Sequence, residues 1–498
     1  MPRARSHLVG SASVVSPSVA LEPSALSSDL LTGHLESLLR SPLFEAVVHR
    51  GREQNELRDR VLTVPLLALL LVHYVLQALP SWAALLRRLA DGHLPGLPAL
   101  TVTRQAFGQR LRDVPHTLLL SLLVDASRTL RASPWRRPWV SQLAPWATGI
   151  FALDDTTLDA LLDKLGWLAE LPKGAPERLA GRLGCLLDLT TGKLAEVLYD
   201  DDSGANEKTH LRPLLQRLTA GSLVVMDLGY FCFELFDWMH QQQLVFVTRL
   251  KAKVTYRVDR VLADRPLYRD RLIVLGTAPK GDRCATTMRL VELCLDGKWL
   301  SYLTNELDPQ RLPAEAVWAL YGERWTIEMA FAAIKISLGL AKLRSNDLNA
   351  ALGQIWMTLL LFQVLQDLRL QIATEAGWKA DDVSWQKLLE RIESYVEKPS
   401  PKMSLHDWLL SRATKAGLKK EGQRVRKLRQ LPDAVAADCD LTPLAALSVP
   451  SGRTNKYKGK RKSEREAAKK RGSQSRSVPT VVGLLPVGAP SKETGGSA

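Results

Sequence analysis

The spacing of hydrophobic residues divides the chain into a helical first part, a mixed centre and a helical last part. From Leu30 to about Ala132, apolar side chains recur every three or four positions, with interruptions at Pro80 and at 94–98. This period is that of amphipathic helices, whose apolar stripe faces a core. Helical spacing returns after the centre and continues to about Leu447.

Short apolar runs in the centre predict strands that alternate with helices. The strands are predicted at 149–153, 185–189, 194–199, 223–226 and 244–248, and the helices at 206–218 and 231–241. Such alternation is typical of an α/β sheet. Two of these strands lead into acids, Asp154-Asp155 and Asp227, and open α/β sheets place their ligands at such strand ends.

Between residues 251 and 305 the pattern predicts strands without helices. The strands are predicted at 254–258, 271–276, 288–295 and 299–304. Asp296-Gly297 between the last two is a strong signal for a tight hairpin turn. The sequence therefore predicts a β insertion in the sheet domain.

The helix predicted after the insertion carries a polar stripe beside an apolar one. The polar residues follow the pattern Y-x2-R-x3-E-x6-K and are Tyr321, Arg324, Glu328 and Lys335. They lie within about 60° of one another on a helix that turns roughly 100° per residue. The apolar residues are Ile327, Phe331, Ile334 and Leu338. Two cations, a carboxylate and a phenol at the edge of a core suggest a site for phosphate and metal, and a solvated face with intrahelical ion pairs is the alternative.

Charge is distributed unevenly along the chain. The 498 residues are 46% hydrophobic, enough for several cores, and carry a formal net charge of +15. Residues 451–476 contain eleven Lys or Arg and two Glu, a net charge of +9, and have no apolar periodicity. They predict a disordered cationic arm suited to nucleic acid or to an anionic membrane surface. A tail that only improves solubility is the alternative.

Several features point to a reduced, cytosolic protein. The five cysteines are scattered, with no C-x2-C pair, which argues against structural zinc. Residues 1–28 lack the apolar core of a signal peptide. The most hydrophobic run, Val64 to Leu79, is short for a membrane span and contains His73 and Gln77, so it predicts a buried helix.

A possible DNA-binding helix is predicted at 101–112. The segment that begins at Thr101 has the pattern of a capped helix, and three arginines on it are expected to be available to a DNA backbone: Arg104, Arg110 and Arg112. Arginine-bearing amphipathic helices are common, so an ordinary surface helix is the alternative.

Three carboxylates are candidates for metal chemistry. A compact α/β domain can bring together Asp154 or Asp155, Asp227 and Glu328. Two divalent cations about 4 Å apart need such anionic oxygens, and they stabilise the attacking and leaving oxygens of an in-line phosphoryl displacement. Any single Asp at a strand end is more often a cap or turn residue, so the interpretation depends on the whole set.

Five blocks of the sequence resemble, in order, those of the "insertion sequence four" family of bacterial DDE transposases. The blocks are 153–158, 225–230, 246–249, 303–305 and 321–335, and the resemblance spans roughly residues 30–370. It implies a ribonuclease H-like catalytic core with a β insertion and cut-and-paste movement of DNA. It also implies two metal ions, Mg²⁺ with Mn²⁺ as a substitute.

The resemblance also implies roles for individual residues. The metal-binding catalytic triad would be Asp154, Asp227 and Glu328. The residues that hold phosphates near the transposon end would be Tyr321, Arg324 and Lys335. Similar proteins make a DNA hairpin by flipping a base onto aromatic residues, and Trp299 is a candidate for that stacking, although a strand Trp is more often part of a core.

Two acidic neighbours compete with the triad. The family usually has Gly where this chain has Asp155, but successive strand residues face opposite ways, so only one of the pair can face the metals, and we favour Asp154. Glu323 precedes Glu328 by five residues and points roughly 140° away from the polar stripe, so we discount it. The basic arm lies outside the family pattern.

The predicted fold class is α/β, with a ribonuclease H-like core interrupted by the insertion and helical regions on both sides. The predicted divisions are a disordered segment (1–29), a helical DNA-binding domain (30–142), the first part of the core (143–250), the β-rich insertion (251–305), the second part of the core (306–372), a helical region (373–450) and a basic disordered tail (451–498).

The predicted function is that of a DNA transposase. It would bind the terminal inverted repeats of its insertion sequence, excise the element and join it to target DNA by two-metal phosphoryl transfer. Double-stranded DNA is the expected partner, a homodimer on paired ends the expected assembly, and the cytoplasm the expected location. A catalytically inactive or domesticated DNA-binding relative is the alternative. A glycosidase explains neither the Tyr-Arg-Lys array nor the arm, and a membrane-surface protein does not explain the triad.

Overall fold

The computed structural model describes most of the chain outside its two ends. The described residues are 62–94, 97–158, 182–200, 212–276, 283–340, 343–345, 347–398, 402–414, 417–420, 431–439 and 480–484. The predicted segment 1–29, the basic arm at 451–476 and the start of the helix predicted at 206–218 lie outside these ranges.

Within the described residues, ten strands form one mixed sheet in the order β10-β3-β2-β1-β4-β5-β9-β8-β7-β6. Their bounds are β1 Ile150–Thr157, β2 Arg182–Asp188, β3 Lys193–Asp200, β4 Leu223–Met226, β5 Val245–Arg249, β6 Tyr256–Asp264, β7 Tyr268–Leu275, β8 Met288–Leu295, β9 Lys298–Thr304 and β10 Thr480–Gly483. β1 is parallel to β4 and β4 to β5, and the other neighbours are antiparallel. The α/β prediction is confirmed, and each predicted strand is present.

The predicted insertion is a four-stranded extension of this sheet. β6 to β9 form an antiparallel meander that joins the other strands through β5, where Thr248 lies opposite Leu303. Asp296 and Gly297 between β8 and β9 have φ values of 51° and 73°. Two consecutive positive φ values are those of a type I′ hairpin turn, so the predicted turn is confirmed.

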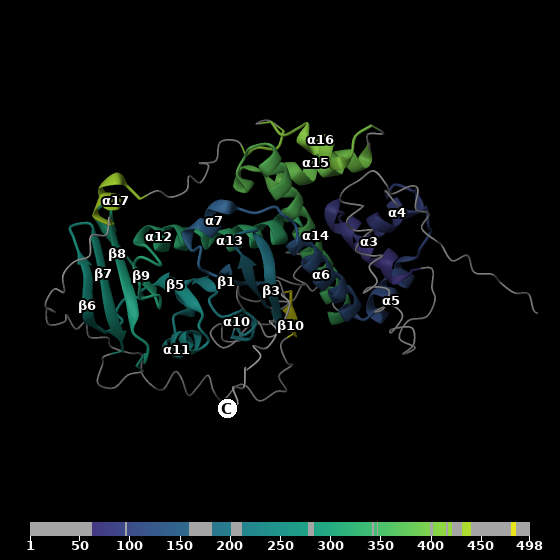
Figure 1. Ribbon diagram of the computed structural model, residues 1–498. Helices are drawn as coiled ribbons and strands as arrows, with labels where there is room; N and C mark the ends of the chain where they lie inside the picture. Colours follow the sequence, from purple (N-terminus) through teal and green to yellow (C-terminus); the bar gives the residue numbers. More distant parts are fainter. Residues whose placement is uncertain are drawn as a thin grey trace, which may run out of the picture.

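Helices flank the sheet and extend beyond one end of it. They are α3 Val64–Leu76, α4 Trp82–Ala90, α5 Arg104–Asp113, α6 His116–Arg131, α7 Pro138–Leu143, α10 Arg212–Leu215, α11 Phe233–Gln241, α12 Ala314–Glu323, α13 Trp325–Ala332, α14 Leu348–Glu375, α15 Trp385–Glu397, α16 Leu405–Leu410 and α17 Asp433–Cys439. In Figure 1 the insertion strands lie at the left, the remaining strands in the centre and α3 to α6 at the right.

Helix α14 is the central support of the helical part. It contacts α3, α5, α6 and β3. Its length and composition alone would suit a membrane span, but 89% of its most apolar window is buried inside the protein. α14 is therefore a core helix. The shorter helix α3 is also mostly buried, as its sequence predicts.

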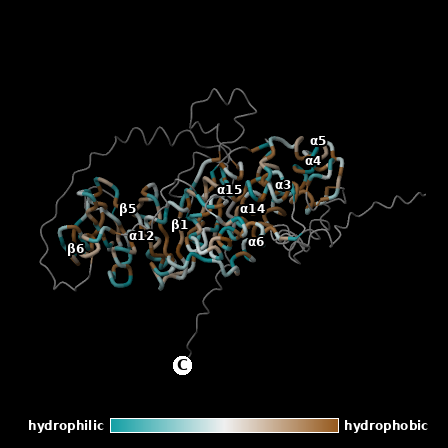
Figure 2. The backbone as a smooth tube through the Cα atoms, turned by 90° about the horizontal axis from the view of Figure 1, so that it is seen from above, coloured by the Kyte–Doolittle hydropathy of each residue, from teal (hydrophilic) through white to brown (hydrophobic). Residues whose placement is uncertain are grey.

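The apolar side chains form a large core on one face of the sheet and a smaller one on the other. The larger core joins β1, α13 and α14 with the helices before the sheet, and the smaller one lies between the sheet and α11. Figure 2 shows apolar stretches running through both the region of β1 and the region of α3 and α14. The sheet is therefore packed on both faces along its centre.

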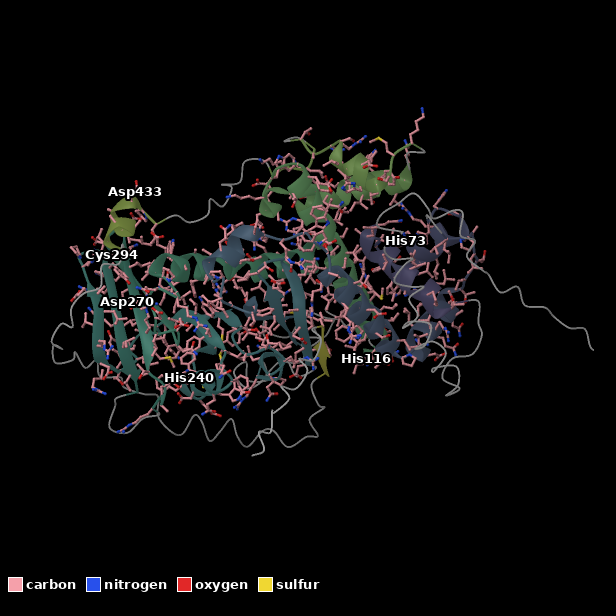
Figure 3. The ribbon with its side chains drawn as sticks, viewed as in Figure 1. His73, His116, His240, Asp270, Cys294 and Asp433 are labelled. Atoms are coloured by element: carbon pink, nitrogen blue, oxygen red, sulfur yellow. The ribbon has the colours of Figure 1, made fainter. Side chains whose placement is uncertain are left out.

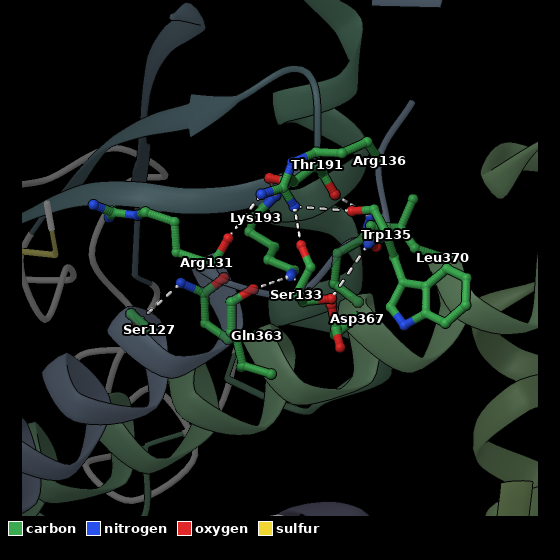
Figure 4. A network of polar contacts seen from close by, with 12 residues as sticks. Ser127, Arg131, Ser133, Trp135, Arg136, Thr191, Lys193, Gln363, Asp367 and Leu370 are labelled. Carbon is green, nitrogen blue, oxygen red and sulfur yellow. Dashed lines mark hydrogen bonds and ion pairs between the residues drawn. The ribbon is translucent and has the colours of Figure 1, made fainter. Parts of the chain in front are cut away.

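Buried polar contacts fix the helical region to the sheet. The ammonium group of Lys193 on β3 lies 2.5 Å from Asp367 on α14 and donates to the carbonyl of Leu130 on α6 at 2.7 Å. Gln363, one turn earlier on α14, donates to Ser127 on α6 and to the carbonyl of Leu194 on β3 (Figure 4). These contacts hold β3, α6 and α14 together. Removing any one of the polar groups would leave its buried partner unpaired.

A fully buried ion pair fixes the insertion to the helix that follows it. Arg289 on β8 lies 2.6 Å from Asp270 on β7, and neither side chain is exposed. Arg289 also donates to the carbonyl of Leu312, just before α12, and the hydroxyl of Tyr268 donates to Asp270. Figure 3 shows Asp270 within the insertion strands. The position of α12 thus depends on the insertion.

The prediction for α5 is wrong in one residue. Thr103 caps the helix as expected, by accepting a hydrogen bond from the backbone N–H of Ala106. Arg110, however, is 4% exposed and donates to the carbonyl of Leu62, so it is not available to DNA. Arg104 and Arg112 are exposed. The guanidinium of Arg110 instead binds a carbonyl 48 positions earlier in the chain. Helical periodicity alone cannot predict such a distant partner.

Part of the region predicted as a disordered tail is a strand. β10 pairs antiparallel with β3, with Thr480 opposite Tyr199. Just after it, the backbone N–H of Leu484 donates to the buried carboxylate of Glu196 at 3.2 Å, and Arg131 donates to the carbonyl of Leu484. Since an uncovered sheet edge presents unpaired backbone groups, β3 offers a template for this segment.

Candidate active site

The sheet brings the predicted acids of β1 and β4 to the same edge. The two strands are parallel, and their last paired residues are Leu153 and Met226, so Asp154 and Asp227 follow at the same level. Asp227 leaves the sheet and begins a short 3-10 helix. β1, in contrast, continues through Asp154 to Thr157, because β2 still pairs with it there. Asp154 therefore lies within a strand rather than after its end.

Asp154 and Asp155 face opposite sides of the sheet, as strand alternation predicts. The carboxylate of Asp154 lies 3.7 Å from Arg324, on the side of α13. The carboxylate of Asp155 lies 3.1 Å from Arg182 on β2. Only Asp154 of this pair therefore approaches Asp227 and Glu328.

The helix that carries Glu328 is less regular than its sequence predicts. α12 ends at Glu323 and α13 begins at Trp325, and a π-helical turn, Ala333–Ser337, follows α13. The apolar stripe is buried as predicted, at Ile327, Phe331, Ile334 and Leu338. Glu323 lies 2.8 Å from Arg137, the residue just before α7, so it points away from Glu328, as its helical spacing predicts.

Arg324 lies in the middle of the three acids. Its guanidinium nitrogens lie 2.7 Å from Glu328, 3.7 Å from Asp154 and 3.8 Å from Asp227. Burial lowers the pKa of this guanidinium, but the carboxylates of Asp227 and Glu328 outweigh burial and raise it above its usual range. The sequence placed Arg324 beside Glu328 on one helix and did not predict its contacts with Asp154 and Asp227.

Asp154 is the most perturbed of the acids. Burial raises its pKa from 3.8 to about 6, opposed by the backbone N–H of Asp155 and by Arg324. The backbone N–H of Asp155 donates to the Asp154 carboxylate at 2.9 Å. A carboxyl group with a raised pKa beside like charges is typical of a functional site.

Tyr321 and Lys335 lie near the acids without touching them. The ring of Tyr321 packs against Tyr302 of β9 at 5.2 Å, and its centre is 5.8 Å from the Arg324 guanidinium. The ammonium group of Lys335 donates to the carbonyl of Thr157 at 2.9 Å, just beyond the acids of β1. The polar stripe thus faces the sheet edge, but its members have different partners.

Sequence reasoning missed Arg249 as a site residue. It ends β5, is exposed, and lies near enough to Tyr321 for its charge to lower the pKa of that phenol, which burial raises more strongly. The block 246–249 could have indicated this position. A cation at the end of a buried strand parallel to β4 lies at the same sheet edge as Asp227.

Trp299 lies on the part of β9 that extends beyond β5. Tyr302 is the last β9 residue paired with β5, opposite Arg249, so Trp299 is three positions further out. The indole is partly buried, and the guanidinium of Arg269 lies 4.2 Å from its ring centre. Trp299 is therefore neither a fully buried core residue nor a freely projecting one.

The acids have the chemistry of a hard-cation site but do not form a closed cage as placed. In the part of the chain that the structure describes, no group of three or more Asp, Glu, His or Cys side chains stands close enough together to hold a metal ion. Asp154, Asp227 and Glu328 instead converge on Arg324. Carboxylate oxygens are the ligands that Mg²⁺ and Mn²⁺ prefer, so the donor set fits such ions once the guanidinium moves.

Comparisons with known proteins match the sequence to transposases. Residues 145–363 match the family model described as "Transposase DDE domain". A putative transposase, y4zB, from Sinorhizobium fredii is 28% identical over 37% of this chain and 53% of its own length. The transposase InsG for insertion sequence element IS4 from Escherichia coli is 24% identical over 37% of this chain and 43% of its own length. The chain thus spans about half the length of these two relatives.

A solved structure of the piggyBac transposase synaptic complex with hairpin DNA also matches, with 11% identity and a TM-score of 0.41 over 82% of this chain and 88% of that one. A likeness this weak adds no weight to the assignment. The family match covers the strands and the helix that carry Asp154, Asp227 and Glu328. Residues 145–363 of this chain therefore match the model of a transposase DDE domain, and the relatives that match the chain are described as transposases.

Proposed function

We propose that the protein is a DNA transposase, a metal-dependent enzyme that cleaves DNA strands at the ends of an insertion sequence and transfers them to target DNA. The observation that carries this proposal is the convergence of Asp154, Asp227 and Glu328 on one point at the sheet edge. These acids come from β1, from the end of β4 and from α13, all inside the matched domain.

The proposed catalytic core is ribonuclease H-like. An antiparallel β1-β2-β3 meander, followed by β4 and β5 parallel to β1 in the order β3-β2-β1-β4-β5, supports it. The proposed divisions of the chain are those predicted from the sequence, with the insertion at 251–305. Helices α3 to α6 would belong to the DNA-binding domain, to which α5 presents the exposed Arg104 and Arg112.

Asp154, Asp227 and Glu328 would hold two Mg²⁺ ions, with Mn²⁺ as a substitute. When bound, the ions would activate water and stabilise the attacking and leaving oxygens of phosphoryl transfer. The buried position of Asp154 would keep bulk water from one side of the reacting phosphate, since its side chain is only 19% exposed. No covalent protein intermediate and no organic cofactor is required.

Phosphates of the element end would lie against Tyr321, Arg324 and Lys335. Arg324 can donate two parallel hydrogen bonds to a phosphate from its planar fork, which a lysine cannot do. Lys335 lies at the end of β1, where a phosphate next to the cut would be expected. Arg249 would add a fourth cation at this edge. Trp299 is the proposed stacking platform for a flipped base.

The proposed partner is double-stranded DNA, first the element ends and then the target. A homodimer on paired ends, located on DNA in the cytoplasm, is the proposed assembly. An inactive or domesticated DNA-binding relative is not favoured, because such a protein has no need of all three acids.

The test is metal-dependent cleavage of a plasmid that carries the element between its terminal repeats. Asp227→Asn and Glu328→Gln should each abolish cleavage in Mg²⁺ while binding to the ends stays close to that of the unmodified protein, because each change removes a metal ligand and no phosphate contact. Cleavage at a near wild-type rate by either variant would reject the assignment of the triad.

A further inference from the structure

Arg324 makes a set of contacts that a simple phosphate-binding residue does not need. Its side chain is only 13% exposed, and its nitrogens face Glu328 at 2.7 Å, Asp154 at 3.7 Å and Asp227 at 3.8 Å. All three carboxylates therefore share one cation. The shortest of these contacts is a close ion pair.

A guanidinium and a divalent ion compete for the same carboxylate oxygens. The Glu328 oxygen that lies 2.7 Å from Arg324 cannot ligate a metal ion in the same direction. Like charges about 4 Å apart also repel strongly where water is partly excluded. The present position of Arg324 is therefore incompatible with ions bound by all three acids.

We propose that Arg324 is the built-in counter-ion of the triad, and that a divalent ion binds by displacing its guanidinium from the carboxylates. The proposal rests on the proposed function, since it concerns the same three acids. Until displacement, Arg324 neutralises part of the negative charge that Asp154, Asp227 and Glu328 accumulate at the sheet edge. After displacement, its fork is free for a phosphate.

The direction of the effect on metal affinity follows from this competition. Removing the cation deletes a competitor, so a neutral side chain at position 324 should bind metal more tightly. If the lost contact with Glu328 has the strength of one charge-assisted hydrogen bond, the gain is about tenfold. A residue that only positions the acids for metal would give the opposite result, because its loss would weaken metal binding.

The consequence for the reaction is a coupling between metal and DNA. A phosphate that attracts the guanidinium of Arg324 frees the acids, and bound metal in turn frees the guanidinium for a phosphate. By thermodynamic linkage, each ligand should raise the affinity for the other by the same factor.

The experiment is a titration of the full-length protein with Mn²⁺ in the absence of DNA, followed by the electron paramagnetic resonance signal of free Mn²⁺. The variants are Arg324→Gln and Arg324→Met, both uncharged, Arg324→Lys, which keeps the charge, and Asp227→Asn. Arg212→Gln is the matched control, since it removes one arginine charge from an exposed pair with Glu234 on another part of the surface. Circular dichroism verifies that each variant is folded.

Both uncharged variants should bind Mn²⁺ about tenfold more tightly than the unmodified protein, while Arg324→Lys and Arg212→Gln stay close to it. The folded uncharged variants could instead bind Mn²⁺ equally or more weakly, while Asp227→Asn still loses binding. That result would overturn the counter-ion role of Arg324 and would not contradict the proposed function. An unmodified protein that binds no Mn²⁺, or binds it equally after Asp227→Asn, would overturn both.

Discussion

Asp154→Asn should remove cleavage and at the same time stabilise the fold. Burial raises the pKa of this carboxyl group to about 6, compared with 3.8 for an ordinary aspartate. Its side chain is 19% exposed, so solvent screens it little. Because a difference of one in pKa corresponds to about 1.4 kcal/mol, the ionised form costs the folded state up to about 3 kcal/mol.

The sign of the pH dependence follows from the raised pKa. Well below pH 3.8 the carboxyl group is protonated in both the folded and the unfolded chain, so it costs nothing. As the pH rises through the window from about 4 to about 6, the unfolded chain ionises first and the free energy of unfolding falls. Asparagine has the shape of the protonated acid and does not ionise. The free energy of unfolding of the variant therefore does not fall in this pH window.

The assay is thermal unfolding of the metal-free proteins at pH values from 5 to 8, in EDTA. For a domain of 150–250 residues, 1 kcal/mol corresponds to roughly 2–4 °C, so the variant should melt up to about 6–12 °C higher at pH 8. The difference should shrink as the pH approaches 5.

Asp155→Asn is the matched control from the next position on the strand. Its carboxylate lies 3.1 Å from Arg182, with both side chains largely buried, so the change breaks a buried pair and should lower the melting temperature. Cleavage should survive in this variant better than in Asp154→Asn. An Asp154→Asn protein that melts lower than the unmodified one, or higher by a margin independent of pH, would refute the reasoning.

Three further changes test other parts of the account. Replacing the Lys and Arg residues of 451–476 by Gln, with β10 kept intact, should reduce the slope of log affinity against log salt on random DNA; an unchanged slope would reject a DNA role for the arm. Arg289→Met should lower the free energy of unfolding by about 3–5 kcal/mol in denaturant titration, because it leaves the buried Asp270 carboxylate without its cation, and adding Asp270→Leu should restore most of it. Arg324→Lys should impair paired-end complexes in a gel-shift assay more than Mn²⁺ binding; normal assembly with weakened Mn²⁺ binding would move Arg324 into the metal site.

The elements around the site follow from local patterns in the sequence. The strands that become β1, β4 and β5 are apolar runs, and parallel pairing of β1 with β4 places Asp154 and Asp227 at one level. The alternation of side chains along a strand indicated that only one of Asp154 and Asp155 faces the site, and the position of Asp154 in its sequence block favoured that residue. These features depend on periods of two or 3.6 residues, which a sequence displays directly.

The contacts between elements could not be predicted in this way. Arg324 reaches two acids that lie 170 and 97 positions earlier in the chain, and no local period encodes such meetings. The same holds for the pair of Arg137 and Glu323, which are separated by 186 positions. β10 was missed because its partner is the free edge of β3, nearly 300 residues away.

The most direct test of the central claim, that the acids act as metal ligands in DNA cleavage, is a change of metal specificity at position 227. Asp227→Cys places a thiolate where an oxygen ligand is proposed, and Mn²⁺ accepts sulfur more readily than Mg²⁺ does. Cleavage of the plasmid that carries the element ends should be lost in Mg²⁺ and restored in Mn²⁺, while Asp227→Asn stays inactive in both. Equal activity of Asp227→Cys in the two metals, or restoration of Asp227→Asn by Mn²⁺ to the same extent, would contradict the account.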